Sequence, residues 1–135
     1  MKPDLEPVKT ADGSLTYYRK DVDQCYHSRS GAFEEALKKH VLPSGVLDCA
    51  DFASSITIAD VCFGLGYNSI VACGELRRKH PDLPVTVFAF ENDLSILKKI
   101  PSLSFEETYW PLQRMVSSIV LDPMFPVLQE FVRSV

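Results

Sequence analysis

Two short runs of apolar residues lie in the middle of the chain. Ile56 to Val61 and Val85 to Phe90 are rich in β-branched and aromatic residues, and turn-forming or polar residues follow each run. Runs of this length and composition are typical of buried parallel strands. Between them, from Asn68 to Lys79, apolar residues recur at helical spacing, with Asn68 or Ser69 at the position of an N-cap. This order predicts two adjacent parallel strands joined by a right-handed crossover helix.

The N-terminal third has a different pattern. Ala11 to Ser14 is a turn signal inside the segment Pro7 to Tyr18, whose later half is rich in strand-forming residues. This segment predicts a small β-hairpin. Apolar residues then recur at helical spacing from Ala32 to Val41, which predicts a helix that Ser28 or Ser30 caps.

The C-terminal third predicts helices only. Leu94 to Ile100 has the pattern of a short helix that ends before a proline, and Phe105 to Val120 and Phe125 to Val135 have the pattern of two amphipathic helices. No strand pattern follows Phe90. We therefore expect one α/β domain, with a hairpin and a helix in residues 1–45 and a βα core with C-terminal helices in residues 46–135.

Composition narrows the class of protein. The chain has 135 residues, of which 46% are hydrophobic, so it has enough apolar residues for one globular core. No apolar run approaches membrane-spanning length, and the N-terminus lacks the apolar region of a signal peptide, so we expect a cytoplasmic protein with no membrane contact. A net charge of −4 argues against a protein that binds nucleic acid by itself. Any contact with RNA must therefore involve a local part of the surface or be supplied by another chain.

Cysteine and histidine spacing gives no metal or redox motif. The four cysteines include no Cys-x-x-Cys pair, and the three histidines stand far apart in the sequence. Neither a zinc site nor a redox pair is therefore predicted, and we expect free thiols.

The turn after the first predicted strand contains candidate binding residues. Asp60 ends the strand, and Gly64 and Gly66 precede the helix. Glycines tolerate positive φ and let a ligand approach the backbone, while the helix start offers unpaired N–H groups. A plain strand-to-helix turn is the alternative interpretation.

The residues of this turn favour one ligand over another. A dinucleotide fingerprint would have a third glycine where the chain has Ser69. Asp60 would repel a pyrophosphate but attract a cationic amine such as that of S-adenosylmethionine. A Walker phosphate loop is excluded because no Gly-Lys-Ser/Thr follows the glycines. An NAD-type oxidoreductase is therefore the weaker hypothesis.

Glu91 follows the second predicted strand directly. Because the carboxyl ends of parallel strands meet at one edge of a sheet, we expect Glu91 near Gly64, where a carboxylate can bind both hydroxyls of a ribose. The alternative is that Glu91 only stabilises the start of the next helix. The same alternative applies to Glu34 and Glu35, which lie in the first turns of their predicted helix.

Two stretches resemble a known family. The first combines Thr10 to Thr16 with Tyr26 to Ala36, and the second is Asp60 to Asn68. Together they resemble the methyltransferase domain of the bacterial tRNA 5-methylaminomethyl-2-thiouridine biosynthesis protein, in its single-domain type. The first stretch is the more specific of the two.

The resemblance implies a Rossmann-like class I S-adenosylmethionine-dependent methyltransferase fold. It implies that the cofactor is held at the glycine turn and the second strand end by Gly64, Gly66 and Glu91. It also implies that the same pocket is lined from the N-terminal side by Ser28, Gly31 and Glu35.

The chain departs from this family in two ways. Cys62 stands where many methyltransferases have the first glycine of the loop. In addition, the later strands of the family, including those with acids near the adenine and the target amine, have no counterpart after Ile100. We therefore expect a truncated fold, either the N-terminal part of the domain or a shortened member.

Two functions follow from the resemblance. The first is a methyltransferase that acts on the aminomethyl group of a wobble 2-thiouridine in tRNA, with help from a missing segment or a partner chain. The second is a non-catalytic remnant that binds S-adenosylmethionine or another protein.

With so few strands one sheet edge stays open, which predicts self-association, a partner chain or covering by the C-terminal helices.

Overall fold

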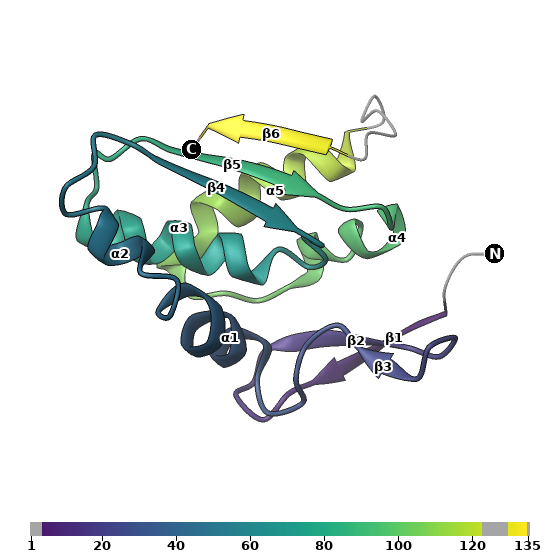
Figure 1. Cartoon of the computed structure of the whole chain (residues 1–135). Helices are drawn as coiled ribbons and strands as arrows, with labels where there is room; N and C mark the ends of the chain where they lie inside the picture. The colour runs from purple at the N-terminus through teal and green to yellow at the C-terminus, as the bar shows by residue number, and fades with distance from the viewer. Residues whose placement is uncertain (1–3, 123–129, 135) are drawn as a thin grey trace.

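A computed structural model describes residues 4–122 and 130–134 of the chain (Figure 1). The N-terminal strands are β1 (Leu5–Lys9), β2 (Leu15–Arg19) and β3 (Gln24–Cys25). They form an antiparallel sheet in the order β1-β2-β3, which confirms the predicted hairpin. The third strand was not predicted, because it is only two residues long and follows a polar stretch.

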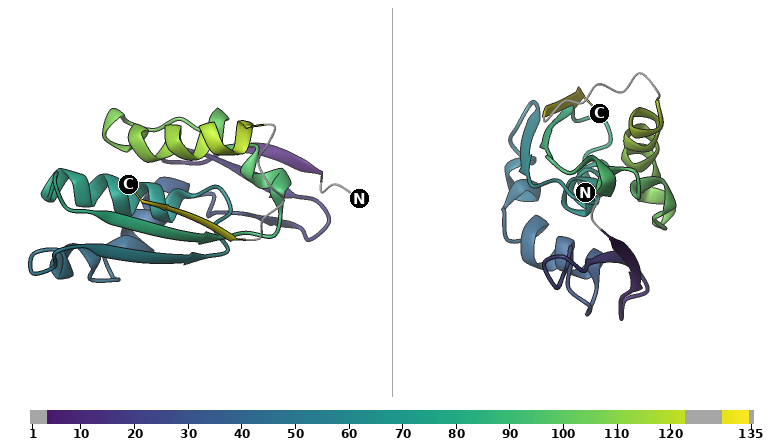
Figure 2. Two further views of the ribbon diagram at one scale, coloured as in Figure 1. Left: turned by 90° about the horizontal axis from the view of Figure 1, so that it is seen from above. Right: turned by 90° about the vertical axis from the view of Figure 1, so that its right-hand side faces the viewer.

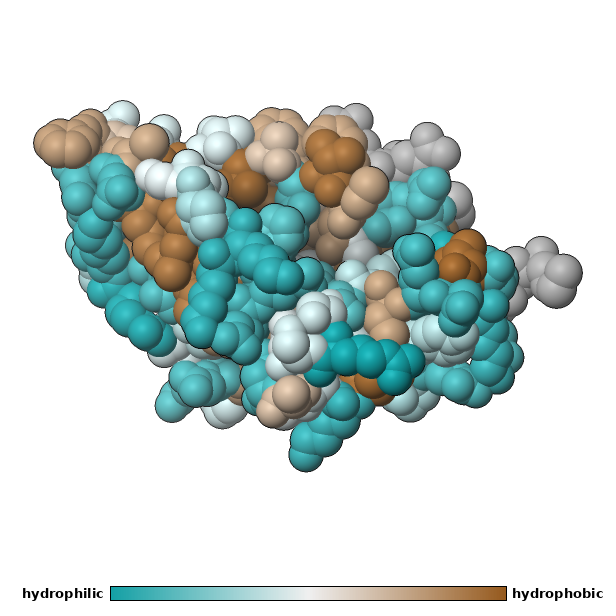
Figure 3. Space-filling view, turned by 60° about the horizontal axis from the view of Figure 1, so that its bottom comes forward, coloured by the Kyte–Doolittle hydropathy of each residue, from teal (hydrophilic) through white to brown (hydrophobic). Residues whose placement is uncertain are grey.

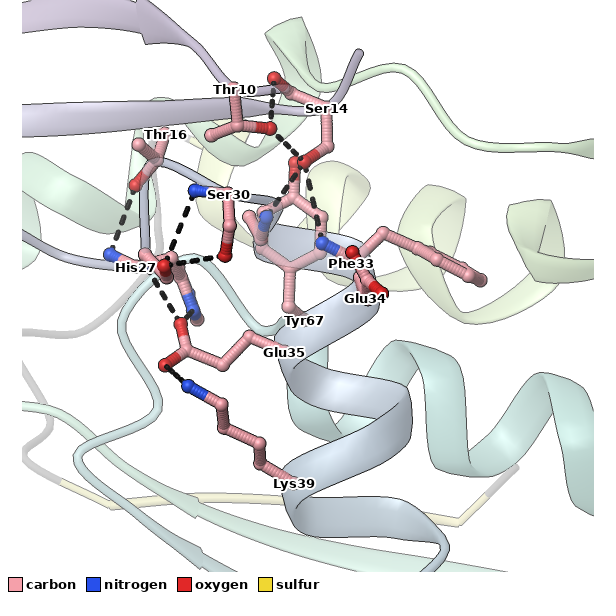
Figure 4. A network of polar contacts seen from close by, with 12 residues as sticks. Thr10, Ser14, Thr16, His27, Ser30, Phe33, Glu34, Glu35, Lys39 and Tyr67 are labelled. Atoms are coloured by element: carbon pink, nitrogen blue, oxygen red, sulfur yellow. Dashed lines mark hydrogen bonds and ion pairs between the residues drawn. The ribbon is translucent and has the colours of Figure 1, made fainter. Parts of the chain in front are cut away.

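The helix after the hairpin begins as α1 (Ala32–Glu35) and continues as the π-helical segment η1 (Ala36–Val41). Its first N–H groups are bound by the hairpin turn. Ser14 Oγ accepts from the Ala32 N–H at 2.9 Å, and Asp12 Oδ2 accepts from the Glu34 N–H at 2.9 Å. Figure 4 shows Ser14 above the start of this helix. Residues that lie 18 and 22 positions earlier in the chain therefore cap the helix.

The predicted caps of this helix, Ser28 and Ser30, are wrong. The residue at the N-cap position is Gly31, and the hydroxyls of the two serines bond to each other at 2.7 Å. A capping side chain is normally sought at the helix boundary. Here the tertiary fold brings the capping groups from the hairpin instead.

The central βα unit follows the prediction. A short helix α2 (Val46–Cys49) precedes it, and its elements are β4 (Ile56–Val61), α3 (Tyr67–Lys79) and β5 (Val85–Phe90). The strands β4 and β5 are adjacent and parallel, and their last residues, Val61 and Phe90, are register partners. The N-cap of α3 is Gly66, with φ 76°, rather than Asn68 or Ser69. A left-handed residue at this position suits glycine.

The sheet is covered on one face by helices. In β5, Val85, Val87 and Ala89 are buried, while the alternate residues are more exposed. Figures 1 and 2 show α3 and the C-terminal helix α5 (Trp110–Leu121) on the same side of the sheet. The opposite face of β4 is open within the described residues, and Val61 there is 71% exposed. Burial of both strand faces, which the apolar runs suggested, is therefore not seen in the described structure.

The chain after β5 differs from the prediction in one main respect. Its helices are α4 (Leu94–Leu97), the 3₁₀ segments η2 (Ile100–Ser102) and η3 (Glu107–Tyr109), and α5. The predicted helix over Phe125 to Val135 is wrong where it is described, because β6 (Glu130–Ser134) is a strand antiparallel to β5. Residues 123–129 lie outside the described structure. Short apolar runs do not distinguish helix from strand, and pairing with β5 decides the outcome.

Tyr67 joins the N-terminal sheet to the central unit. Its side chain is fully buried, and its hydroxyl donates to the Leu15 carbonyl at 2.7 Å and accepts from the Leu15 N–H at 3.2 Å. The two sheets therefore belong to one core, which is continuous from Tyr17 through Tyr67 to Val87.

On the side of the molecule shown in Figure 3, hydrophobic residues form separate patches among hydrophilic ones.

The capping role of Asp12 leads to a stability prediction. Burial alone would raise the pKa of Asp12. Hydrogen bonds from Ser14, the Glu34 N–H and Thr10 together have the larger effect, and they lower that pKa from 3.8 to about 2. We expect Asp12→Ala to lower the free energy of unfolding by about 1–2 kcal/mol, the usual cost of a lost cap. Urea denaturation measures this, with Asp82→Ala, at an exposed position outside the turn, as the control.

The pH dependence of this effect has a definite sign. Because the folded pKa of Asp12 is lowered, its contribution is full above pH 4 and disappears as the pH falls toward about 2. The wild-type and Asp12→Ala proteins should therefore converge in stability over this range. An equal difference between them at neutral pH and at pH about 2 would contradict the capping role.

Candidate functional site

The carboxyl ends of β4 and β5 meet at one rim of the sheet. Glu91 Oε2 accepts from the Gly64 N–H at 2.7 Å, and Glu91 Oε1 accepts from the N–H groups of Asn92 and Asp93, each at 2.9 Å. The predicted proximity of Gly64 and Glu91 is therefore confirmed. Glu91 also binds the N–H groups that precede α4, so a structural role, which the sequence offered as the alternative, is present as well.

The turn between β4 and α3 depends on left-handed backbone. Cys62, Gly64 and Gly66 have φ values of 62°, 58° and 76°. At Gly66 a Cβ atom would lie 2.7 Å from the Phe63 ring, so only glycine fits there. Cys62 adopts a backbone conformation that costs L-residues energy and that glycine would adopt without this cost. Gly64 has more room, because the nearest atom to a Cβ placed there would be a Tyr26 ring carbon at 3.5 Å.

Asp60 is buried at the base of the turn. Its carboxylate accepts from Ser69 Oγ at 2.5 Å, and burial raises the pKa of Asp60 while the bonds from Ser69 oppose that rise. Ser69 therefore binds this carboxylate. In the sequence, its identity was only evidence against an NAD-binding fingerprint. Asp60 also lines a cavity of about 450 Å³ between β4, α3 and η1. Asn68 lines the same cavity, and its Oδ1 atom is buried without a hydrogen-bond partner in the described structure.

The N-terminal unit contacts the glycine turn through Tyr26 and His27. Tyr26 packs beside Gly64, and its hydroxyl donates to Asp93 Oδ2 at 3.0 Å. Burial and this hydrogen bond raise the pKa of Tyr26 to about 12. The His27 ring lies edge-on to Tyr67, with centroids 5.0 Å apart. The family resemblance pointed to this segment, but a role for Tyr26 and Asp93 was not predicted.

Glu35 faces His27 on the other side of this contact (Figure 4). Glu35 Oε2 accepts from the Ser28 N–H at 2.7 Å and lies 3.5 Å from His27 Nδ1, and Lys39 Nζ is 3.7 Å from Oε1. Burial lowers the pKa of His27, and Glu35 partly opposes this shift. The imidazole is therefore neutral at physiological pH, and it lies in a cavity of about 420 Å³ that Ser28 and Glu35 also line.

Gly31 has a packing role. A Cβ atom there would lie 2.3 Å from Asp12 Oδ2, so a larger residue would displace the cap of α1. Gly31 lines neither of the two cavities described above. Ser28 and Glu35 line one of them and Asp60 lines the other, whereas Gly64, Gly66 and Glu91 line neither.

Metal and membrane sites are not seen in the described residues. No group of three or more His, Cys, Asp or Glu side chains in residues 4–122 could hold a metal ion. All four cysteines are free thiols. None of the described helices is long and apolar enough to cross a membrane.

Comparison with known proteins gives a structural match over most of the chain. The chain is similar to the crystal structure of MnmC2 from Aquifex aeolicus, with a TM-score of 0.71 and 33% sequence identity. The match covers 87% of this chain and 37% of MnmC2. The chain therefore has an MnmC-like α/β fold and spans little more than a third of the protein that it resembles.

Sequence comparison is less informative. A stretch of 72 residues is 38% identical to an uncharacterized protein of Methanocaldococcus jannaschii, covering 53% of this chain and 19% of that protein. No family model matches the chain.

The left-handed conformation of Cys62 leads to a second stability prediction. Glycine would remove the backbone cost of about 1–2 kcal/mol at this φ, at an entropic cost of about 0.5–1 kcal/mol. We therefore expect Cys62→Gly to raise the free energy of unfolding by about 0.5–1 kcal/mol. The control is Cys49→Gly, at another exposed cysteine that is helical, where glycine should lower stability. A change of the same sign in both variants, measured by urea denaturation, would contradict a backbone origin of the effect.

Proposed function

We propose that this chain binds S-adenosylmethionine at the rim formed by the glycine turn and Glu91, as the cofactor-binding part of a tRNA-modifying methyltransferase. The observation that carries this proposal is the hydrogen bond of 2.7 Å between the Gly64 N–H and Glu91 Oε2. It brings an acid from the end of one parallel strand to the glycine turn at the end of its neighbour. This is the position at which open α/β sheets bind their ligands.

The residues at the rim suit the chemistry of this cofactor. An ionised carboxylate has about four acceptor positions. Three backbone N–H groups already bond to Glu91, so a ribose hydroxyl would take the remaining position or replace one of these donors.

Asp60 suits the cationic end of the same ligand. Its carboxylate is buried, and burial raises its pKa because a charge there lacks solvation. A sulfonium or ammonium group nearby would favour the ionised form and gain from the weakly screened attraction. A pyrophosphate would have the opposite effect, which supports S-adenosylmethionine over NAD.

The resemblance of the first stretch and the structural similarity to MnmC2 support tRNA as the substrate class. The reaction would be methylation of the aminomethyl group of a wobble 2-thiouridine. Bound S-adenosylmethionine supplies a methyl group on a positively charged sulfur, and transfer is an in-line displacement that depends mainly on positioning. The protein must also keep the target amine neutral, and His27, with its lowered pKa, is a neutral imidazole packed against the first residue of α3.

A second candidate is a non-catalytic protein that binds S-adenosylmethionine. Both candidates share the cofactor site, so a binding experiment tests them together and a turnover experiment separates them.

We expect titration calorimetry to detect binding of S-adenosylmethionine or S-adenosylhomocysteine and no comparable binding of NAD. Glu91→Ala should weaken binding by about 1–3 kcal/mol, because ribose hydroxyls lose a charged partner. That corresponds to a factor of about 5–150 in the dissociation constant. Glu107→Ala, at an exposed position in η3, should bind as the wild type does.

Two results of this titration would overturn the cofactor site. One is tight binding of NAD with no heat from S-adenosylmethionine. The other is unchanged affinity in Glu91→Ala, which would leave Glu91 with only its bonds to the backbone. Thermal unfolding of each variant must show a folded protein, since Glu91 also holds the turn.

We expect the chain alone not to methylate tRNA that contains 5-aminomethyl-2-thiouridine at a useful rate. The measurement is transfer of labelled methyl from S-adenosylmethionine, first with this chain and then with a chimera that adds the unmatched part of Aquifex MnmC2. Only the chimera should turn over. Rapid turnover by the chain alone would assign the proton chemistry to residues present here, with His27, Glu34 and Glu35 as the first candidates.

A further inference from the structure

The side chain of Tyr26 crosses from the N-terminal sheet to the start of α4. The Tyr26 N–H donates to the Tyr17 carbonyl at 3.0 Å, which fixes its backbone to β2. Its hydroxyl donates to Asp93 Oδ2 at 3.0 Å, at the N-cap of α4. Figure 1 shows α4 and the N-terminal sheet at the end of the central sheet where β4 and β5 finish. Tyr26 therefore spans the rim at which the two strands end.

The Tyr26 ring separates the glycine turn from the cavity on the N-terminal side. A Cβ atom at Gly64 would lie 3.5 Å from a carbon of this ring, so the ring packs against the backbone of the turn. Tyr26 also lines the cavity of about 420 Å³, together with Ser28 and Glu35, whereas Gly64 does not line it. The ring therefore stands between Gly64 and that cavity.

The carboxylate of Glu91 is largely occupied in this conformation. Oε2 accepts from the Gly64 N–H, and Oε1 accepts from the N–H groups of Asn92 and Asp93. A carboxylate has about four acceptor positions, so two ribose hydroxyls can bind it only if one of these donors leaves. The Gly64 N–H is the donor on the turn against which Tyr26 packs. Opening of the site at Glu91 is therefore coupled to movement of Tyr26.

We propose that Tyr26 is a gate, held closed by its bond to Asp93, which swings away from the glycine turn when the nucleoside part of S-adenosylmethionine binds. In the open position, the cavity lined by Ser28 and Glu35 becomes continuous with the rim at Glu91. The gate explains how these three residues can serve one pocket although the described conformation keeps them apart. This proposal rests on the proposed cofactor site.

The groups that the gate bond joins keep partners when it opens. Asp93 Oδ1 accepts from the Ser95 N–H at 2.9 Å and from Ser95 Oγ at 2.5 Å, and neither bond involves Tyr26. Arg19 Nη1 lies 4.0 Å from Asp93 Oδ2 and remains beside it. Tyr26 is only half-buried, so water can replace Asp93 as the partner of its hydroxyl. The closed and open positions therefore differ by an amount that a ligand can outweigh.

Tyr26→Phe tests the gate because it removes only the hydroxyl that bonds to Asp93. A protein that binds its ligand only in the open state has an affinity reduced by the open fraction, so loss of the closing bond should tighten binding. We expect the dissociation constant of S-adenosylhomocysteine, measured by titration calorimetry, to fall about three- to tenfold. Tyr18→Phe is the matched control, since Tyr18 also donates to an aspartate, Asp23, at 2.6 Å but at an exposed site. Its affinity should equal that of the wild type.

Nuclear magnetic resonance of ring-labelled tyrosine follows the movement itself. The Tyr26 signal, assigned by its absence in Tyr26→Phe, should shift when the wild-type chain is saturated with S-adenosylhomocysteine, and the Tyr18 signal should not. Binding that is detected only in Tyr26→Phe would also support the gate.

The failure of the gate and the failure of the cofactor site give different results. Unchanged or weaker binding in Tyr26→Phe would overturn the gate and leave the cofactor site in place, as would a Tyr26 signal that does not move on saturation. Absence of binding in both the wild type and Tyr26→Phe would instead overturn the cofactor site, and the gate with it.

Discussion

The parallel pairing of β4 with β5 is the constraint on which the rest of the structure depends. Because the two strands run in the same direction and in register, their carboxyl ends meet at one rim, with Asp60 and Glu91 close to the same turn. The turn after β4 must then reverse the chain into α3 within a few residues, and three of those residues are left-handed. The Gly64 N–H that this reversal exposes is bonded to Glu91.

The N-terminal unit is built onto this turn. Tyr67, the first residue of α3, bonds to the backbone of Leu15 in the hairpin, while Tyr26 packs beside Gly64. The same hairpin caps α1 through Asp12 and Ser14. A conformational change in the glycine turn would therefore act on the hairpin and on the segment that contains His27.

Several residues that suggested ligand contacts have structural roles as well. Gly31 leaves room for Asp12, Gly66 leaves room for Phe63, and Asp60 is bonded to Ser69. A turn that approaches a ligand closely must first be held in one conformation, and the same side chains can do both. Substitutions at these positions should therefore be compared for stability before any effect on binding is interpreted.

The sequence alone determined the central βα unit, because apolar runs and helical spacing are local signals that tertiary contacts here reinforce. It also determined that Gly64 and Glu91 meet, since strand order and direction decide which ends are adjacent. Only the tertiary structure decided the caps of α1, the pairing of β6 with β5, and the contact of Tyr26 with Gly64. Each of these joins residues far apart in the chain, and no local pattern records the partner.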